Sequence, residues 1–168
     1  MQAYYQRRAP EYDDWWLGDG LYAPVPEKWA EERDNLLVTL GGLPPKRTLD
    51  VGCGTGFVTL HLPGELVGLD QSDAMLQVAA KRVKTAEFVV GDALELPFED
   101  GSFDRIFTSH FYGHLEEPER RKFLGEARRV APELVVVDSG TQGGVERGEW
   151  QDRVLKDGSQ WRVYKRYL

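Results

Sequence analysis

The feature that most constrains the fold is a glycine-rich turn, Gly52-Cys53-Gly54-Thr55-Gly56, which directly follows a short apolar run at residues 47–51. Glycine has no Cβ, so it lets the backbone turn sharply and lets a ligand approach where any side chain would collide. A buried strand that ends in such a turn is typical of parallel α/β sheets, whose ligands collect at the carboxyl ends of the strands. The turn therefore predicts a ligand-binding loop.

The rest of the chain repeats short apolar runs separated by helical stretches. We expect strands at residues 47–51, 66–69, 87–90, 103–108 and 134–137. Helices fit between them, because Ser72 can cap a helix at 72–82 and Pro118 suits the first turn of a helix at 117–130. Right-handed crossovers then give the strand order 3-2-1-4-5. The expected fold is α/β, a doubly wound, mostly parallel, Rossmann-like sheet.

The chain length fits one domain. Its 168 residues with 41% hydrophobic content can build one sizeable core. Residues 1–40 are aromatic and charged and are interrupted by prolines, which predicts a helical cap ending in a helix near 27–40. We expect the ligand-binding core at 46–138. Residues 139–168 then form a short C-terminal segment, with a helix near 145–156 and a strand at 161–167.

Composition excludes several classes of protein. The net charge of −7 supplies no broad positive surface, so nucleic acid is a disfavoured partner. The single Cys53 allows no internal disulfide, and neither cysteine nor histidine spacing predicts a metal site. No apolar run approaches the roughly 20 residues needed to cross a bilayer, and the N-terminus lacks a signal-peptide pattern. We therefore expect a cytoplasmic protein without a membrane partner.

A dinucleotide-binding loop is the main alternative interpretation of the turn. The dinucleotide fingerprint is GxGxxG, whose third glycine permits close packing of helix on strand. This chain has GxGxG, with Phe57 where that third glycine would stand. The dinucleotide interpretation also leaves Asp50, just before the turn, without a role. A nicotinamide-dependent oxidoreductase is thus the weaker hypothesis.

The segment LDVGCGTG at residues 49–56 resembles the first motif of the class I S-adenosylmethionine-dependent methyltransferases. Residues 68–72, Gly-Leu-Asp-Gln-Ser, resemble the end of that family's second strand, and residues 91–98 resemble the segment after its third strand. The resemblance extends over residues 4–138 and points to the small-molecule branch of the family. It implies S-adenosylmethionine as cofactor, with S-adenosylhomocysteine as its product.

The same resemblance implies roles for individual residues. Gly52, Gly54 and Gly56 would form the cofactor loop, and Asp70 would accept both ribose hydroxyls. Asp92 would accept from the adenine amino group, beside the backbone N–H of Ala93. The remaining cofactor candidates are Tyr5, Asp50, Cys53, Gln71, Met75 and Ser109.

Each of these residues also has a purely structural interpretation. Asp70 could cap the helix that begins near Ser72, Asp92 could hold a turn, and Met75 could belong to the core. Five aromatic residues near the N-terminus could fold over the cofactor sulfonium or could only fasten the cap to the sheet; they are Tyr4, Tyr5, Tyr12, Trp15 and Trp16. Both interpretations remain open.

Methyl transfer from a sulfonium is an in-line displacement that needs alignment and exclusion of water, without a metal or a covalent intermediate. A base is needed only for an acceptor that arrives protonated. His110, just beyond the fourth strand, is the best-placed candidate, ahead of His114 and His61. The segment Thr108-Ser109-His110-Phe111-Tyr112 lacks the DPPY-type signature of nucleic-base methylation. A small-molecule acceptor is therefore expected.

The C-terminus departs from the family pattern. Members close the sheet with two further strands, whereas only about thirty residues follow Asp138 here. The closing strands are therefore expected to be truncated, with residues 161–167 paired to the fifth-strand side of the sheet or exchanged with a second chain. A homodimer would cover the open edge. A cofactor-binding or regulatory relic without turnover is the alternative function.

Overall fold

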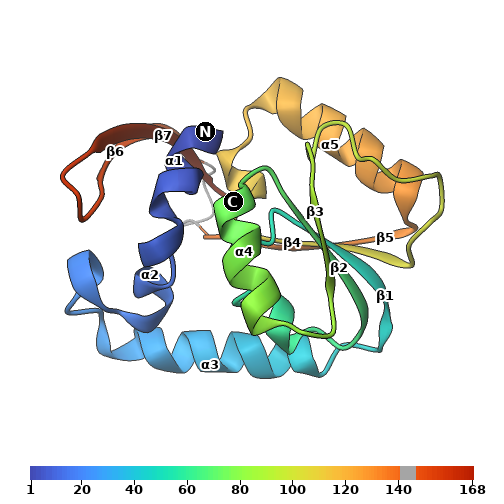
Figure 1. Ribbon diagram of the computed structural model, residues 1–168, viewed down its shortest axis with the longest axis horizontal. Helices are drawn as coiled ribbons and strands as arrows, with labels where there is room; N and C mark the ends of the chain where they lie inside the picture. Colours follow the sequence, from blue (N-terminus) through green and yellow to red (C-terminus); the bar gives the residue numbers. More distant parts are fainter. Residues whose placement is uncertain (141–146) are drawn as a thin grey trace.

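The computed structural model describes residues 1–140 and 147–168. Its centre is a parallel five-stranded sheet with the order β3-β2-β1-β4-β5 (Figure 1). The strands are β1 (Lys46–Val51), β2 (Gly64–Asp70), β3 (Glu87–Val90), β4 (Arg105–Ser109) and β5 (Glu133–Val137). The predicted fold class, strand order and all five strands are confirmed, with shifts of one or two residues at their ends.

Two helices lie along opposite faces of the sheet, α5 on one face and α3 on the other (Figure 1). Phe123, Ala127 and Val130 of α5 (Glu117–Val130) pack on Leu49 and Ile106 from the sheet. On the opposite face, Phe107 packs with Leu40 of α3 (Glu27–Gly41). The central strands β1, β2 and β4 are therefore largely buried on both sides, which explains their continuous apolar runs.

The helix starts follow the predicted capping chemistry. Ser72 is the N-cap of α4 (Asp73–Arg82), and its side chain accepts a hydrogen bond from the Met75 N–H at 3.3 Å. Glu116 and Glu119 form a capping box at the start of α5. The other helical elements are α1 (Gln2–Arg8), η1 (Ala9–Glu11), α2 (Asp14–Leu17), η2 (Gly20–Tyr22), η3 (Thr59–His61) and η4 (Tyr112–His114).

The C-terminal segment differs from the prediction. The helix expected near 145–156 is wrong, because Arg147–Val154 forms strand β6; residues 145 and 146 lie outside the described residues. β6 pairs antiparallel with β7 (Gln160–Tyr167) in a separate two-stranded sheet. The expected pairing of residues 161–167 with the fifth strand of the same sheet is therefore also wrong. The physical reason is local: Gly158, at φ +81°, closes a tight turn that lets the two strands meet after a short loop.

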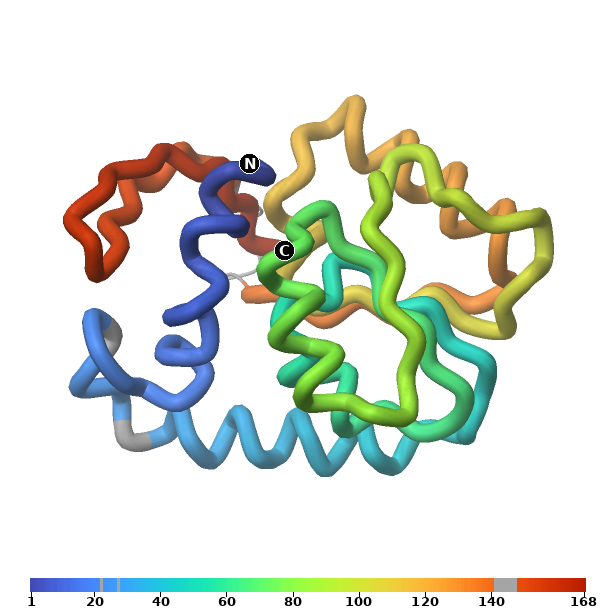
Figure 2. The backbone as a smooth tube through the Cα atoms, viewed as in Figure 1, coloured from blue at the N-terminus to red at the C-terminus, as the bar shows by residue number. Residues whose placement is uncertain are grey.

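The β6–β7 hairpin lies beside the N-terminal helix α1, far from it in sequence (Figure 2). Tyr4 packs with Leu155 and Val163 in a small core of its own. Arg7 forms an ion pair with Asp157 at the hairpin turn. The hairpin and the N-terminal helices therefore form one wall at the carboxyl ends of the strands. In the described part of the chain, no helix is both long enough and apolar enough to span a membrane.

Candidate cofactor and acceptor site

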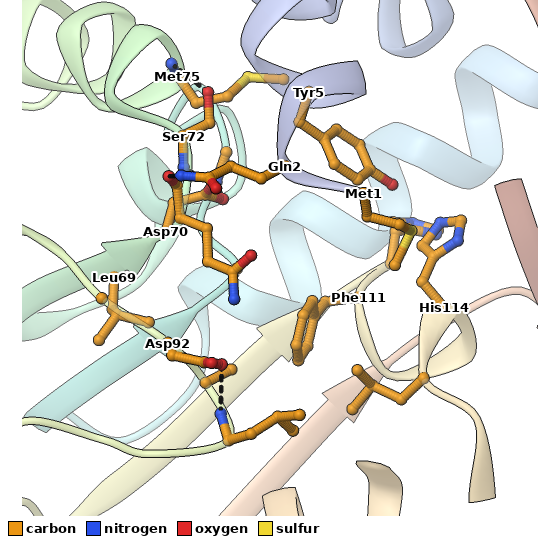
Figure 3. A pocket seen from close by; sticks show the side chains of 18 of the residues that line it. Met1, Gln2, Tyr5, Leu69, Asp70, Ser72, Met75, Asp92, Phe111 and His114 are labelled. Carbon is orange, nitrogen blue, oxygen red and sulfur yellow. Dashed lines mark hydrogen bonds between the residues drawn. The ribbon is translucent and has the colours of Figure 1, made fainter. Parts of the chain in front are cut away.

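A pocket of about 290 Å³ opens at the carboxyl ends of β1, β2 and β4. In Figure 3, Asp70 and Asp92 lie on one side of this pocket, and Tyr5 and His114 lie on the other. The pocket brings together most of the residues predicted from the sequence: Tyr5, Gly52, Gly54, Asp70, Gln71, Met75, Asp92, Ala93, Ser109 and His110. It lies at the switch point between β1 and β4, where ligands of doubly wound sheets bind.

The glycine loop is held against the end of β2. The N–H groups of Gly52 and Cys53 donate to the carbonyl oxygen of Leu69 at 2.8 and 3.1 Å. Gly52 and Gly54 have φ of +72° and +54°, a conformation that favours glycine. A Cβ added to Gly54 would extend toward the ring of Tyr12, 3.5 Å away, on the pocket side. The loop therefore presents bare backbone to the pocket.

Asp70 joins two structural elements while lining the pocket. One carboxylate oxygen accepts the N–H of Gly54 at 3.0 Å, and the other accepts the N–H of Ser72 at 2.8 Å. Burial raises the pKa of Asp70, and these N–H groups act in the opposite direction. A carboxylate offers about four lone-pair sites, so accepting capacity remains for a ligand beside these N–H groups. The capping interpretation and the pocket interpretation of Asp70 are thus both part of the geometry.

Asp92 also serves a turn and the pocket together. Its Oδ1 accepts the N–H of Leu94 at 2.9 Å (Figure 3), which is the turn-forming bond that Asp side chains commonly make. Its Oδ2 makes no hydrogen bond to any residue in the described ranges. The neighbouring Ala93 is buried and lines the same wall. A ligand amino group can therefore reach one carboxylate oxygen without disturbing the turn.

Three predicted cofactor residues do not line the main pocket: Asp50, just before the loop, and Cys53 and Gly56 within it. Asp50 is 2% exposed and accepts the hydroxyl of Thr59 at 2.6 Å; burial raises its pKa to about 7. Cys53 packs near Gly68 of β2. A Cβ on Gly56 would lie 3.1 Å from that of Ala79 in α4. These three positions support the shape of the loop.

Ser109, at the end of β4, carries a buried hydroxyl oxygen with no hydrogen-bond partner among the described residues. A buried polar atom without a partner costs about 1–3 kcal/mol. Such atoms are rare in folded proteins and call for an explanation. Because Ser109 lines the main pocket, a polar group of a bound ligand would satisfy its hydroxyl.

His110 lies where the fourth strand ends, as expected. Its Nδ1 is 3.9 Å from Oδ1 of Asp138, beyond a normal hydrogen bond, and its ring meets Trp15 and Trp16 edge-on at 4.8 and 5.1 Å. Burial lowers the pKa of His110 to about 4, with the Asp138 carboxylate acting against the shift. The ring is therefore neutral at pH 7. Its φ of +54° lies in the left-handed region, which is uncommon for a residue other than glycine.

His114 is held in one tautomer. Its Nδ1 lies 2.6 Å from the carbonyl oxygen of Tyr164 in β7. A carbonyl oxygen only accepts, so Nδ1 carries the proton and Nε2 keeps its lone pair. Burial lowers the pKa of His114 to about 4, so this ring is also neutral at pH 7. His61 lies in η3, away from the residues that line the pocket.

The N-terminal aromatic cluster divides into two roles. Tyr5 and Tyr12 line the main pocket, whereas Trp16 is 3% exposed and stacks on Phe57 in the core beneath. Tyr4 belongs to the core under the hairpin, and Trp15 packs against His110. Tyr4 and Trp16 therefore fasten the cap, whereas Tyr5 and Tyr12 lie on the pocket wall.

Several lining residues carried no signal in the sequence: Met1, Gln2, Leu69, Leu94, Phe111, Leu115 and Glu119. Phe111 is the clearest case, because a Cβ on Gly52 would lie 2.8 Å from its ring. The glycine at position 52 indicates that another group lies close to the backbone, but only the fold identifies that group as Phe111.

A second cavity of about 170 Å³ adjoins the first and shares Tyr5, Tyr12, His110 and His114 with it. Its other walls come from the N-terminal helices, the hairpin and the chain just after β5; they are Tyr4, Arg8, Trp15, Ser139, Arg153, Val163, Lys165 and Tyr167. The two histidines thus stand on the wall between a space beside the glycine loop and a space under the hairpin. The arrangement offers adjacent sites for two small molecules.

Comparison with known proteins agrees with this geometry. The model of the family described as "Methyltransferase domain" matches residues 49–133, which hold the glycine loop, Asp70, Asp92 and His110. A demethylmenaquinone methyltransferase of Thermotoga maritima is 38% identical over 131 residues, covering 75% of this chain and 54% of that protein. The chain spans about half the length of the curated relatives it matches.

Two further similarities extend the comparison. Ajmaline N-methyltransferase of Rauvolfia serpentina is 35% identical over 100 residues, covering 52% of this chain and 33% of that protein. The solved structure of DhpI in complex with SAH superposes with a TM-score of 0.73 at 25% identity, covering 99% of this chain and 78% of DhpI. The family match takes in half of the chain and every motif on which the resemblance was based. The chain belongs to the methyltransferase domain family, with the fold of the class I S-adenosylmethionine-dependent enzymes.

Proposed function

We propose that the protein transfers a methyl group from S-adenosylmethionine to a small-molecule acceptor. The proposal rests on one observation, which is that two cavities adjoin each other. One lies beside the glycine loop and the other under the hairpin, and both are lined by His110 and His114. Methyl transfer needs two molecules in line, and two adjoining cavities support that arrangement. The names of the relatives, methyltransferases of demethylmenaquinone and ajmaline, support a small organic acceptor.

The residues of the first cavity fit the cofactor chemically. The free lone pairs of Asp70 suit two ribose hydroxyls, and the unbonded Oδ2 of Asp92 suits an adenine amino group. The bare backbone at Gly54 leaves room for the amino-acid end of the molecule, and the unsatisfied Ser109 hydroxyl accepts or donates beside it. Gln71 and Met75 complete the wall on the α4 side. Asp50, Cys53 and Gly56 are proposed to shape the loop.

When bound, S-adenosylmethionine supplies a methyl group made electrophilic by its sulfonium. The protein's part is to align the acceptor lone pair with the carbon–sulfur bond and to keep water out. The new bond joins the acceptor atom to the methyl carbon as the carbon–sulfur bond breaks, and its electron pair stays on sulfur. Tyr5 and Tyr12 face this region with aromatic rings, which suit a positive charge.

An acceptor that arrives protonated must also lose a proton. His110 remains the predicted base from its position, but no described residue forms a hydrogen bond with its Nδ1 that would fix the tautomer. His114 has such a bond, and its Nε2 lone pair is the available one. The acceptor's proton would therefore pass to the neutral ring of His110 or of His114, which both lie on the wall shared by the two cavities. Of the two rings, that of His114 is the better oriented.

The experiment that tests the function is incubation of the protein with methyl-labelled S-adenosylmethionine and a panel of small metabolites. Calorimetry with S-adenosylhomocysteine first confirms that the cofactor site is intact. Label in a metabolite supports the proposal. Cofactor binding without any labelled product contradicts turnover and supports the alternative, a cofactor-binding or regulatory relic.

We also propose a homodimer as the quaternary state. With β7 paired to β6, the outer edge of β5 has no partner strand among the described residues. An open parallel edge invites association with another chain. Light scattering at micromolar concentration decides: twice the chain mass of 19.1 kDa supports the dimer, and 19.1 kDa overturns it.

A further inference from the structure

The second cavity has an unusual charge for this protein. Three cationic side chains line it, Arg8 from α1, Arg153 from β6 and Lys165 from β7, and none of the described residues that line it carries a carboxylate. The chain as a whole carries a net charge of −7. A local reversal of charge inside a cavity focuses an attractive potential on anions.

The cationic character remains after nearby acids are counted. Lys165 pairs with Asp138, and both side chains are nearly inaccessible, at 7% and 0%. Asp138 also accepts the N–H of Gly113 at 2.7 Å and that of Ser139 at 2.8 Å, and it does not line the cavity. The buried Lys165–Asp138 pair is therefore neutral overall, and the cationic character of the cavity comes from the two arginines.

Arg153 is the cation best placed to meet a ligand. Its guanidinium donates to the side-chain oxygen of Gln151, a neutral group, and it forms no salt bridge within the described ranges. Arg8 donates to the hydroxyl of Tyr4 at 3.0 Å and lies 4.8 Å from the ring centroid of Tyr12. Guanidinium groups bind carboxylate and phosphate oxygens through paired, directional hydrogen bonds. The hairpin and α1 thus aim two such groups at one small space.

The remaining walls suit an organic body attached to an anion. Tyr4, Tyr5, Tyr12, Trp15 and Tyr167 supply flat aromatic rings, four of which also carry a hydroxyl. The wall shared with the cofactor pocket carries His110 and His114. A molecule with its anionic end at Arg153 would therefore extend its other end toward the two neutral histidines.

We infer that the second cavity binds the methyl acceptor through an anionic group, a carboxylate or a phosphate, held by Arg153 with Arg8 and Lys165. The inference rests on the proposed function, since it names the class of acceptor for that same site. It also explains the hairpin, because β6 and β7 supply two of the three cations.

The test uses matched acceptors in the presence of labelled S-adenosylmethionine. Each pair differs only in the anionic group: 4-hydroxybenzoate against 4-hydroxybenzyl alcohol, and phosphoethanolamine against ethanolamine. The first pair probes carboxylates and the second probes phosphates. We expect kcat/KM to be about tenfold or more higher for the anionic member of at least one pair.

Arg153→Gln removes the central cation, and Arg162→Gln is its control. Arg162 lies on β7, is exposed above the ring of Trp150, and does not line the cavity. Arg153→Gln should raise KM for the anionic acceptor about tenfold or more, with the dissociation constant of S-adenosylhomocysteine unchanged. Arg153→Lys should recover part of the loss, and Arg162→Gln should change neither value.

A binding measurement separates this inference from the proposed function. The melting temperature of the protein saturated with S-adenosylhomocysteine is measured with benzoate or inorganic phosphate, at constant ionic strength against chloride. Stabilisation of the wild type but not of Arg153→Gln supports the anion site even if no acceptor on the panel is methylated. Equal use of neutral and anionic acceptors, or equal stabilisation of both proteins, overturns the anion site and leaves the methyl-transfer proposal standing.

Discussion

The carboxylate of Asp70 accepts the backbone N–H of Gly54 at 3.0 Å, which ties the end of β2 to the glycine loop after β1. The same carboxylate accepts the N–H of Ser72, the residue that caps α4. One side chain thus sets the relative positions of three elements around the pocket. This explains how a single acid can be both a structural tie and a ligand contact.

Asp70→Ala should weaken the binding of S-adenosylhomocysteine by about 1.5–3 kcal/mol, because it removes a charged acceptor from hydroxyls that stay buried. Titration calorimetry measures the change. Asp73→Ala is the matched control, since Asp73 is an exposed acid in the first turn of α4 and does not line the pocket. An unchanged dissociation constant in a folded Asp70→Ala protein would leave Asp70 with only its capping role.

Gly54→Val should abolish cofactor binding while the sheet stays folded, because the added side chain points into the pocket toward Tyr12. The φ of +54° also strains any side chain at this position. Gly101→Val controls for that strain, since Gly101 has a φ of +65° and no atom within 4 Å of its added Cβ. Circular dichroism follows folding and calorimetry follows binding. Retained binding by Gly54→Val would contradict the assignment of the loop.

His114→Asn should reduce the loss of stability in mild acid. The pKa of His114 is about 4 in the folded protein, below its ordinary value of 6.5, so the unfolded chain binds its proton first. The contribution of neutral His114 to the free energy of unfolding is therefore complete above pH 6.5 and is lost as the pH falls toward 4. The asparagine keeps a donor for the Tyr164 carbonyl but does not titrate.

Asp50 changes the stability in the opposite direction as the pH falls, but it does so equally in the wild type and in His114→Asn. Comparing these two proteins therefore cancels its effect. Its raised pKa of about 7 favours the folded state at low pH in both proteins alike. We therefore expect the melting temperature of the wild type to fall more steeply than that of His114→Asn between pH 6.5 and 4. Parallel curves would show that His114 is not buried in its neutral form.

Deletion of residues 159–168 should destabilise the protein by several kcal/mol. It removes β7, which supplies Lys165 to the buried Asp138 and a carbonyl to His114. Breaking a buried ion pair by removing one partner costs about 3–5 kcal/mol. Urea unfolding measures the loss. A shortened protein that stays soluble and equally stable would show that the hairpin is dispensable for folding.

The sequence predicted the sheet well because its signals are local. Glycines mark the loop, Ser72 marks the start of α4, and continuous apolar runs mark strands that are buried on both faces. The same signals placed Asp70 and Asp92 in one pocket, since parallel strands bring their carboxyl ends to one edge.

The sequence failed where the outcome depends on distant partners. The orientation of His114 follows from a carbonyl fifty residues away in β7, and no local pattern reports it. For the first strand of the hairpin, Arg147–Val154, the sequence favours a helix, because this polar segment lacks the apolar alternation of a half-buried strand. Its pairing with β7 and its contacts with α1 decide its structure.

The most direct test of the account is titration calorimetry of the wild-type protein with S-adenosylhomocysteine, with NAD titrated in parallel. We expect S-adenosylhomocysteine to bind at one site per chain and NAD to give no binding heat. Absence of S-adenosylhomocysteine binding by the folded protein, or binding of NAD in its place, would contradict the central claim.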